Sequence, residues 1–324
     1  MVLGTRSGVR SKYAWEASNS APAGGVMEIV GGDLLSGDDG SQYVPRGPIG
    51  GGWGQPMASH VSGEEKKPVP DALTVTFFSY LEDKFYRGAF PLPRERIAQL
   101  FAEGFPHKYG KGGRKTYDSI IVGVAPGGAV AVWLSGSRRQ LEVLYGHADE
   151  VSLDWHRALD MPPQVDRQKY VADSLAHAAK KDPLVAPSMQ RVPIGLWDSY
   201  RERFAWTPVF EGIPAPESVG RVSFFNGEHD EIWLPLSDAD RRATRAVPKY
   251  VSFGVESLNR IFDVTFDEAE VFSVFRRLGA SGEPVELVFA QKQIEGKSSF
   301  GVFVRNQHET VGLTKNKYAF FAKH

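Results

Sequence analysis

The segment from Leu73 to Phe105 changes its residue period twice, and this limits the folds that are open to it. β-Branched and aromatic side chains fill 75–80 and 85–90, with a polar turn between the two runs. Prolines end the second run, because proline cannot donate to a β-ladder. Apolar side chains then recur at helical spacing from Ile97, and Gly104 follows them. The segment is therefore predicted to form an antiparallel hairpin and then an amphipathic helix.

The same succession of patterns returns at 249–278. Its two β-rich runs align with those of the first segment, and its helical positions align after a two-residue adjustment, which places Phe275 over Phe101. Upstream, Phe204-Ala205-Trp206 repeats the pattern of Tyr13-Ala14-Trp15. A sustained period is typical of repeated architecture, so the sequence predicts two related domains in tandem, with the two phenylalanines at equivalent core positions.

We therefore predict an α+β fold, made of two duplicated antiparallel β-sheet domains that each carry one packed helix. The first domain is expected at 1–165, a helical linker at 166–203, and a second, shorter repeat at 204–324. Within the first domain, 36–71 is rich in Gly, Pro, Ser and charged residues, which predicts a long loop.

Length and composition agree with two globular domains. A chain of 324 residues is long enough for two domains of about 150 residues, each with its own core. Hydrophobic residues at 42% and charged residues at 24% are typical of globular proteins. The net charge of -1 shows no basic excess of the kind that nucleic acids or anionic membranes attract, so no nucleic-acid partner is expected.

The chain has no cysteine, which excludes disulfides, thiolate metal sites and a cysteine nucleophile. Its first 25 residues lack the apolar core of a signal peptide, and no run of eighteen apolar residues occurs. As given, the chain is expected in the cytoplasm, or in the periplasm if a native export signal has been removed. The oligomeric state stays open.

No residue pattern indicates catalysis. The histidines do not pair at i+3 or i+4, and no G-x-S-x-G elbow occurs, so neither a metal site nor a serine nucleophile is expected. Acidic pairs such as Asp149-Glu150 are typical of solvated loops and helix caps. We predict a protein that is not an enzyme and binds no cofactor or metal. A glycan or small-ligand module that uses Trp53, Trp133, Trp155 and Trp233, or an uncharacterised hydrolase, is the alternative.

Three loops of the first domain, at 50–53, 108–114 and 138–139, combine glycine with Trp, Arg or Lys. Glycine lets another backbone approach closely, and Trp and Arg are enriched at interface hot spots. We predict that these loops contact an acidic protein partner. The predicted partner-binding residues are Trp53, Lys108, Lys111, Arg114, Arg138 and Arg139.

Several short motifs in the first domain carry a family resemblance. They are PDALTV (70–75), LEDKFY (81–86), YDSIIVGVAPGG (117–128), VWLSG (132–136) and VSLDW (151–155). Together they resemble a proteobacterial domain family of unknown function, family 2931, whose members are often small lipoproteins. The resemblance covers about 50–155 and extends more weakly to the second domain.

Members of this family are often encoded beside type VI secretion effectors, notably lipases, and the resemblance implies an immunity or accessory role. The chain departs from the lipoprotein pattern because it has no cysteine for lipidation and carries two copies of the domain pattern. A cytoplasmic immunity protein or an effector-loading adaptor fits these departures best. The expected partner is a cognate secreted effector protein such as a lipase.

Overall fold

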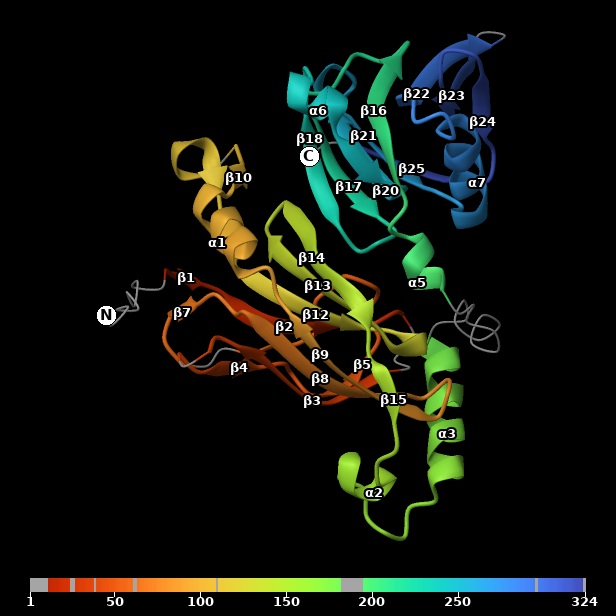
Figure 1. Cartoon of the computed structure of the whole chain (residues 1–324). Coiled ribbons are helices and arrows are strands. Elements are labelled where there is room, and N and C mark those ends of the chain that lie inside the picture. Colours follow the sequence, from red (N-terminus) through yellow and green to blue (C-terminus); the bar gives the residue numbers. More distant parts are fainter. Residues whose placement is uncertain are drawn as a thin grey trace, which may run out of the picture. The chain divides into compact units, whose positions relative to one another are not determined.

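A computed structural model of the chain describes residues 11–23, 27–37, 39–60, 63–108, 110–181, 195–294 and 297–322. The chain divides into two compact units, Met1–Gly195 (unit 1) and Leu196–His324 (unit 2). Strands predominate in both units, and each unit also holds helices, which confirms the α+β class (Figure 1). None of the described helices is long and apolar enough to cross a membrane.

Unit 1 is built from short strands and three α-helices within its described residues. Its strands are β1 (Lys12–Ala14), β2 (Glu16–Ser20), β3 (Met27–Leu35), β4 (Ser41–Tyr43), β5 (Gly47–Ile49), β6 (Ser59–His60), β7 (Lys66–Pro68), β8 (Ala72–Ser79), β9 (Lys84–Pro91), β10 (Phe105–Pro106), β11 (Arg114–Lys115), β12 (Ser119–Val124), β13 (Ala129–Gly136), β14 (Arg139–His147) and β15 (Asp149–Val151). Its helices are α1 (Arg94–Glu103), α2 (Trp155–Ala158) and α3 (Arg167–Lys181).

Two sheets form the body of unit 1. The first sheet has the order β14-β13-β12-β2-β6, in which β2 and β12 are parallel and the other pairs are antiparallel. The second sheet has the order β15-β9-β8-β3-β4, and all of its pairs are antiparallel. The hairpin predicted from the sequence is β8–β9, and the helix predicted after it is α1.

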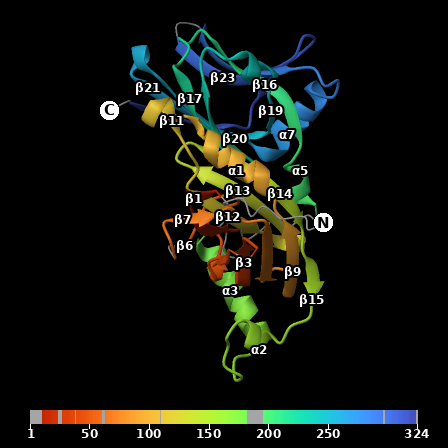
Figure 2. The same cartoon turned by 60° about the vertical axis from the view of Figure 1, so that its left-hand side comes forward.

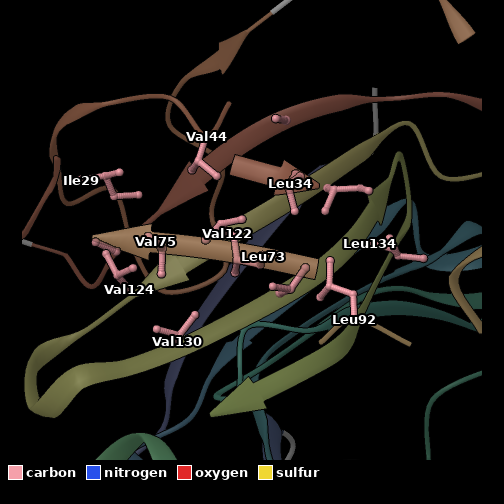
Figure 3. Packing of buried hydrophobic residues seen from close by; sticks show 14 of the residues in the cluster. Ile29, Leu34, Val44, Leu73, Val75, Leu92, Val122, Val124, Val130 and Leu134 are labelled. Carbon is pink, nitrogen blue, oxygen red and sulfur yellow. The ribbon is translucent and has the colours of Figure 1, made fainter. Parts of the chain in front are cut away.

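The two sheets pack face to face through alternating apolar side chains. Leu73 and Val75 of the second sheet lie in one buried cluster with Val122 and Val130 of the first sheet (Figure 3). Helix α1 adds its apolar stripe to the same cluster, because Ile97, Leu100 and Phe101 recur on one of its faces. Burial of such side chains is the main stabilising contribution to this core.

The opposite face of the second sheet is covered in part by α2 and α3. Trp155 of α2 and Val171 of α3 pack against Phe78 and Phe85 of β8 and β9. Figure 2 shows α3 beside the strands of this sheet. The structure differs here from the expected linker at 166–203: its helical part, α3, belongs to the packing of unit 1, and the division between units falls after Gly195.

The long segment 36–71 contains β4 to β7 and is tied down by buried polar side chains of β2. Asn19 donates to the carbonyl oxygen of Pro45 at 2.9 Å and accepts from the backbone nitrogen of Ala58 at 3.1 Å. Ser20 donates to the carbonyl oxygen of Gly52 at 2.9 Å. Polar residues in a buried strand therefore have a structural role, since they satisfy loop backbone groups that would otherwise lack partners.

Unit 2 contains α5 (Leu196–Ser199), β16 (Arg203–Glu211), β17 (Ser218–Phe224), β18 (His229–Trp233), α6 (Asp238–Arg242), β19 (Thr244–Ala246), β20 (Pro248–Val255), β21 (Arg260–Thr265), α7 (Glu268–Leu278), β22 (Val285–Ile294), β23 (Lys297–Arg305), β24 (Thr310–Leu313) and β25 (Lys317–Ala322). Its third sheet has the order β24-β23-β22-β16-β19, with β16 and β22 parallel. Its fourth sheet contains β25-β21-β20-β17-β18 in antiparallel order.

Aromatic side chains fill the core of unit 2. The ring of Phe253, from the fourth sheet, lies 5.0 Å from the ring of Phe210 and 5.1 Å from that of Phe289, both from the third sheet. Helix α7 places Phe275 against Phe204 of β16, with 5.6 Å between ring centroids. Asp267 caps this helix by accepting from the backbone nitrogen of Glu270.

Candidate functional site

The second sheet has an outer face, directed away from the first sheet. The part of this outer face that α2 and α3 do not cover forms a polar hollow. Along β8, Leu73, Val75 and Phe77 point into the core, so Thr74 and Thr76 point to the opposite face. Arg87 of β9 stands opposite Thr76 in the strand register and shares this face. The alternation of the strand therefore places hydroxyl groups and a guanidinium side by side on an open surface.

Two adjoining cavities, of about 540 and about 640 Å³, make up this hollow. They share Gly31, Arg46, Thr76 and Arg87. We call the two together the arginine hollow. The first cavity is also lined by Val30, Ser152, Leu153, Asp154, Arg157 and Ala158, and the second by Gly32, Asp33, Thr74, Val75, Gly88, Ala89 and Asp149.

Three exposed arginines supply the positive charge of the hollow. Arg87 donates from Nε to the hydroxyl oxygen of Thr76 at 3.2 Å, and its terminal nitrogens make no hydrogen bond within the described residues. Arg46 and Arg157 have neither a side-chain hydrogen bond nor an ion pair in the part of the chain that the structure describes. These guanidinium groups are consequently open to an external acceptor.

Gly31 leaves space in the hollow beneath Arg46, because it has no side chain. A Cβ atom placed on Gly31 would lie 3.7 Å from a terminal nitrogen of Arg46, so any larger side chain would fill the space beneath that guanidinium. Gly32 pairs with the core-facing Val75, and a Cβ atom there would come within 2.7 Å of the carbonyl oxygen of Thr74. The register of β3 with β8 shifts between Ile29 and Gly31, so Gly31 directly follows a bulge.

The acidic residues of the hollow are not evenly distributed. In the first cavity, the carboxylate of Asp154 accepts from the backbone nitrogen of Arg157 at 2.8 Å as the N-cap of α2. That carboxylate therefore already has one hydrogen-bond donor within the protein. It is the one acidic residue among the residues that line the first cavity, which also include three arginines. The second cavity balances Arg46 and Arg87 with Asp33 and Asp149. The first cavity is the more favourable place for an anionic group.

A half-buried carboxyl group lies on β3, two residues before Val30, which lines the hollow. Glu28 accepts a hydrogen bond from the hydroxyl of Tyr80 at 2.5 Å. Burial raises the pKa of Glu28 above its ordinary value, and the hydrogen bond from Tyr80 opposes that rise. Burial, followed by the hydrogen bond to Glu28, raises the pKa of the Tyr80 hydroxyl, which stays protonated as the donor.

Guanidinium groups bind carboxylates and phosphates with two parallel hydrogen bonds, and such pairs are stronger than neutral hydrogen bonds. The hollow can therefore bind acidic side chains of a partner, with Val30, Leu153 and Ala158 as an apolar wall beside them. No group of three His, Asp or Glu residues that could hold a metal ion occurs among the described residues.

The tryptophan predicted to contact a partner is buried. Trp53 is 7% exposed, and its ring meets that of Trp133 edge-on with 4.9 Å between centroids. Its loop lies over the first sheet, where Gln140 donates to the carbonyl oxygen of Gly54 at 2.7 Å. Trp53 therefore packs inside unit 1 and offers little surface to a partner. Trp133 and Trp155 are also buried, so they form no exposed glycan platform.

The predicted basic residues lie in two neighbouring turns. Lys111 and Arg114 belong to the β10–β11 hairpin, and Arg138 and Arg139 lie at the β13–β14 turn. A Cβ atom placed on Gly136 of that turn would lie 2.9 Å from the ring of Phe105 and 3.0 Å from the carbonyl oxygen of Thr116, so the turn and the hairpin are neighbours. Arg114 donates to the carbonyl oxygens of Glu103 and Gly104 at 2.8 and 3.1 Å, so it also closes the end of α1. Lys108 is exposed beside this hairpin. The partner-binding role of these residues stays a prediction.

The residues of the arginine hollow were missed because they are far apart in the sequence. Arg46, Arg87 and Arg157 come from a loop, a strand and a short helix. Only the fold brings them together. The paired glycines at 31 and 32, within a strand that otherwise alternates, were the one local signal of an open surface.

The fold and the hollow define the class of this protein: a two-unit β-sandwich protein with an open, arginine-lined hollow on unit 1. Residues 5–184, more than half of the chain, match the family described as "Protein of unknown function (DUF2931)", and the chain belongs to this family. No curated protein and no solved structure matches the chain.

Proposed function

We propose that this protein binds another protein, and that its function is to neutralise or carry a secreted effector. The arginine hollow carries this proposal. It is open rather than enclosed, it is floored by glycine, and three arginines converge on it from separate elements. An acidic segment of a partner protein fits such a surface better than a substrate that must be sequestered from water.

The narrower assignment is an immunity protein or an effector-loading adaptor of a type VI secretion system, with a cognate effector such as a lipase as its partner. This assignment is supported by the resemblance of the motifs in 70–155 to a family whose members are often encoded beside such effectors. A binding protein needs shape and charge complementarity and no catalytic group, which is consistent with the residues of the hollow.

The test is a titration of the full chain with the effector protein that is encoded beside its gene, followed by calorimetry. We expect a complex with a Kd below about 1 μM, a range that corresponds to a specific interface. Reversal of charge at Arg46, Arg87 and Arg157 together should weaken binding at least tenfold and slow association. The affinity of the unchanged chain should fall as salt is added, because exposed charges are screened.

A matched triple variant locates the interface. Charge reversal at Lys111, Arg114 and Arg138 changes the net charge by the same amount, but on the turns that the sequence analysis predicts to contact the partner. If this variant loses binding and the hollow variant does not, the interface lies on those turns. If the unchanged chain and the effector do not associate at micromolar concentration, the immunity proposal fails. Binding of free aspartate or citrate to the hollow, with no effector binding, favours a small-ligand module.

We also propose that the two units arose by duplication. Support comes from the strand orders, which correspond one to one: β15-β9-β8-β3-β4 in unit 1 and β25-β21-β20-β17-β18 in unit 2. The other two sheets correspond in the same way, each with one parallel pair, β2–β12 and β16–β22.

Side-chain contacts support the duplication as well. The ring of Tyr13 stacks on Phe101 of α1 with 5.1 Å between centroids, and Phe204 meets Phe275 of α7 at 5.6 Å. Tyr13 lies two positions before the buried Trp15 in unit 1, and Phe204 lies two positions before the buried Trp206 in unit 2. Recurrence of the same contact at the same place in the pattern is the result expected from a duplicated domain.

A further inference from the structure

Strand β25 of unit 2 carries the largest group of exposed aromatic side chains in the described part of the chain. Tyr318, Phe320 and Phe321 are 36%, 46% and 52% exposed. Phe320 lies 5.5 Å from the ring of Phe262 and 5.6 Å from that of Phe300. Tyr318 and Phe320 thus continue the aromatic core of unit 2 outward on one face of β25, and Phe321 is exposed on the other face. Contiguous apolar surface of this kind marks an interaction site more often than a solvated surface.

The strand that carries these rings is at the edge of its sheet. β25 pairs with β21 along its whole length, from Lys317 opposite Thr265 to Ala322 opposite Arg260. Among the described residues, no strand pairs with its other side. An edge strand of six residues presents backbone donors and acceptors that a further strand can bind.

A cation stands at each end of this edge. Lys317 begins β25, and Arg260 stands beside its last residue. At about 3.3 Å per residue, the two positions are about 17 Å apart along the strand. Both side chains are exposed, and neither has an ion pair or a side-chain hydrogen bond within the residues that the structure describes. The edge therefore has a defined charge pattern as well as an apolar face.

We propose that β25 binds an extended segment of a partner protein as an added strand, and that this segment has apolar residues between two acidic residues about five positions apart. The apolar side chains of the segment lie against Phe320 and Tyr318, and the acidic residues pair with Lys317 and Arg260. A second copy of this chain fits the edge less well, because β25 contains no acidic residue to face the two cations. This surface is independent of the arginine hollow.

The experiment uses the full chain and a fluorescein-labelled peptide of alternating valine and threonine with aspartate at both ends. We expect binding in fluorescence anisotropy, and slower hydrogen exchange of the amides of 317–322 when the peptide is present. Reversal of both cations (Lys317→Glu with Arg260→Glu) should weaken binding of this peptide at least tenfold and should favour a peptide with lysine at both ends. Phe320→Thr should weaken binding of both peptides.

The control reverses two exposed cations elsewhere in unit 2, Arg241→Glu with Arg242→Glu, and should leave peptide binding unchanged. Circular dichroism checks that every variant is folded. Equal binding of the aspartate and lysine peptides, or binding without protection of β25, overturns the proposal. Sedimentation that shows a dimer of the unchanged chain, dissociated by Phe320→Thr, assigns the edge to a second copy instead.

Discussion

Glu28 shows how one half-buried side chain sets a pH dependence of stability. Because burial raises its pKa in the folded protein, the native state holds this proton more tightly than the unfolded state. Its contribution to stability is therefore complete below the unfolded pKa and is lost as pH rises through the folded pKa. We expect the stability of the unchanged chain, relative to Glu28→Gln, to decrease as pH rises above the ordinary pKa of a glutamate side chain. Urea unfolding at several pH values measures this difference.

Glu270 provides a control of opposite sign. Burial acts to raise its pKa, but hydrogen bonds from the backbone of Lys315 and Thr314 outweigh burial, and the pKa is lowered. The stability of the unchanged chain relative to Glu270→Gln should therefore fall as pH falls. If both variants show the same trend with pH, the environment assigned to Glu28 is wrong.

At the scale of residues, the sequence predicted apolar burial better than the position of charges. Phe101 and Phe275 were assigned to the core from helical spacing, and both are buried. Trp53 was assigned to a contact surface because its loop is rich in glycine, but it packs on Trp133. Spacing reports which face of an element is apolar, whereas a loop has no period from which the burial of one ring follows.

At the scale of elements, regular periods were again the reliable signal. The predicted hairpins and helices of both units occur close to the expected positions, including α1, α3 and α7. The role of β2 was not predicted, since its sequence is EASNS, and polar residues do not indicate a central strand. The segment 36–71 was expected to be a plain loop for the same reason, although hydrogen bonds from β2 hold it in place.

Asn19 gives a test of this anchoring. In Asn19→Ala, the carbonyl oxygen of Pro45 and the backbone nitrogen of Ala58 lose their partner. Pro45 is buried, and a buried carbonyl oxygen left unpaired costs about 1–3 kcal/mol of the free energy of unfolding. We expect lower stability in urea and faster proteolysis within 36–71. Ser41→Ala, at an exposed position of the same segment, should change neither the rate of proteolysis nor the stability in urea. Unchanged proteolysis of Asn19→Ala would show that the segment is held by other contacts.

At the scale of the whole molecule, each unit has its own core, and the two phenylalanines test this. Phe101→Ala and Phe275→Ala each remove a buried ring, which lowers the free energy of unfolding by about 3–5 kcal/mol. We expect the first variant to destabilise unit 1 and the second to destabilise unit 2. Hydrogen exchange read separately over β12 and β22 distinguishes them. Equal loss of protection in both units from either variant would show that the two cores unfold as one.

The pairing of distant strands could not be predicted from the sequence. Parallel partners such as β2 and β12 have no hairpin turn between them to signal their contact. The arginine hollow has the same origin, because its three cations meet only after the second sheet and α2 are in place. Local patterns thus predicted the elements of each unit, whereas the arginine hollow depends on contacts between residues far apart in the sequence.

The position of β2 also has a consequence for the order in which unit 1 is made. Its partner in the first sheet, β12, leaves the ribosome about a hundred residues later, and strands so far apart pair slowly. The ribosome adds about 5–20 residues per second, so β2 is exposed for several seconds before β12 has been synthesised. The hairpin β8–β9 is complete before then and can form alone. A chaperone that binds nascent chains would therefore have its longest opportunity at β2, because β3 pairs with β4 and β5, which follow it closely in the sequence.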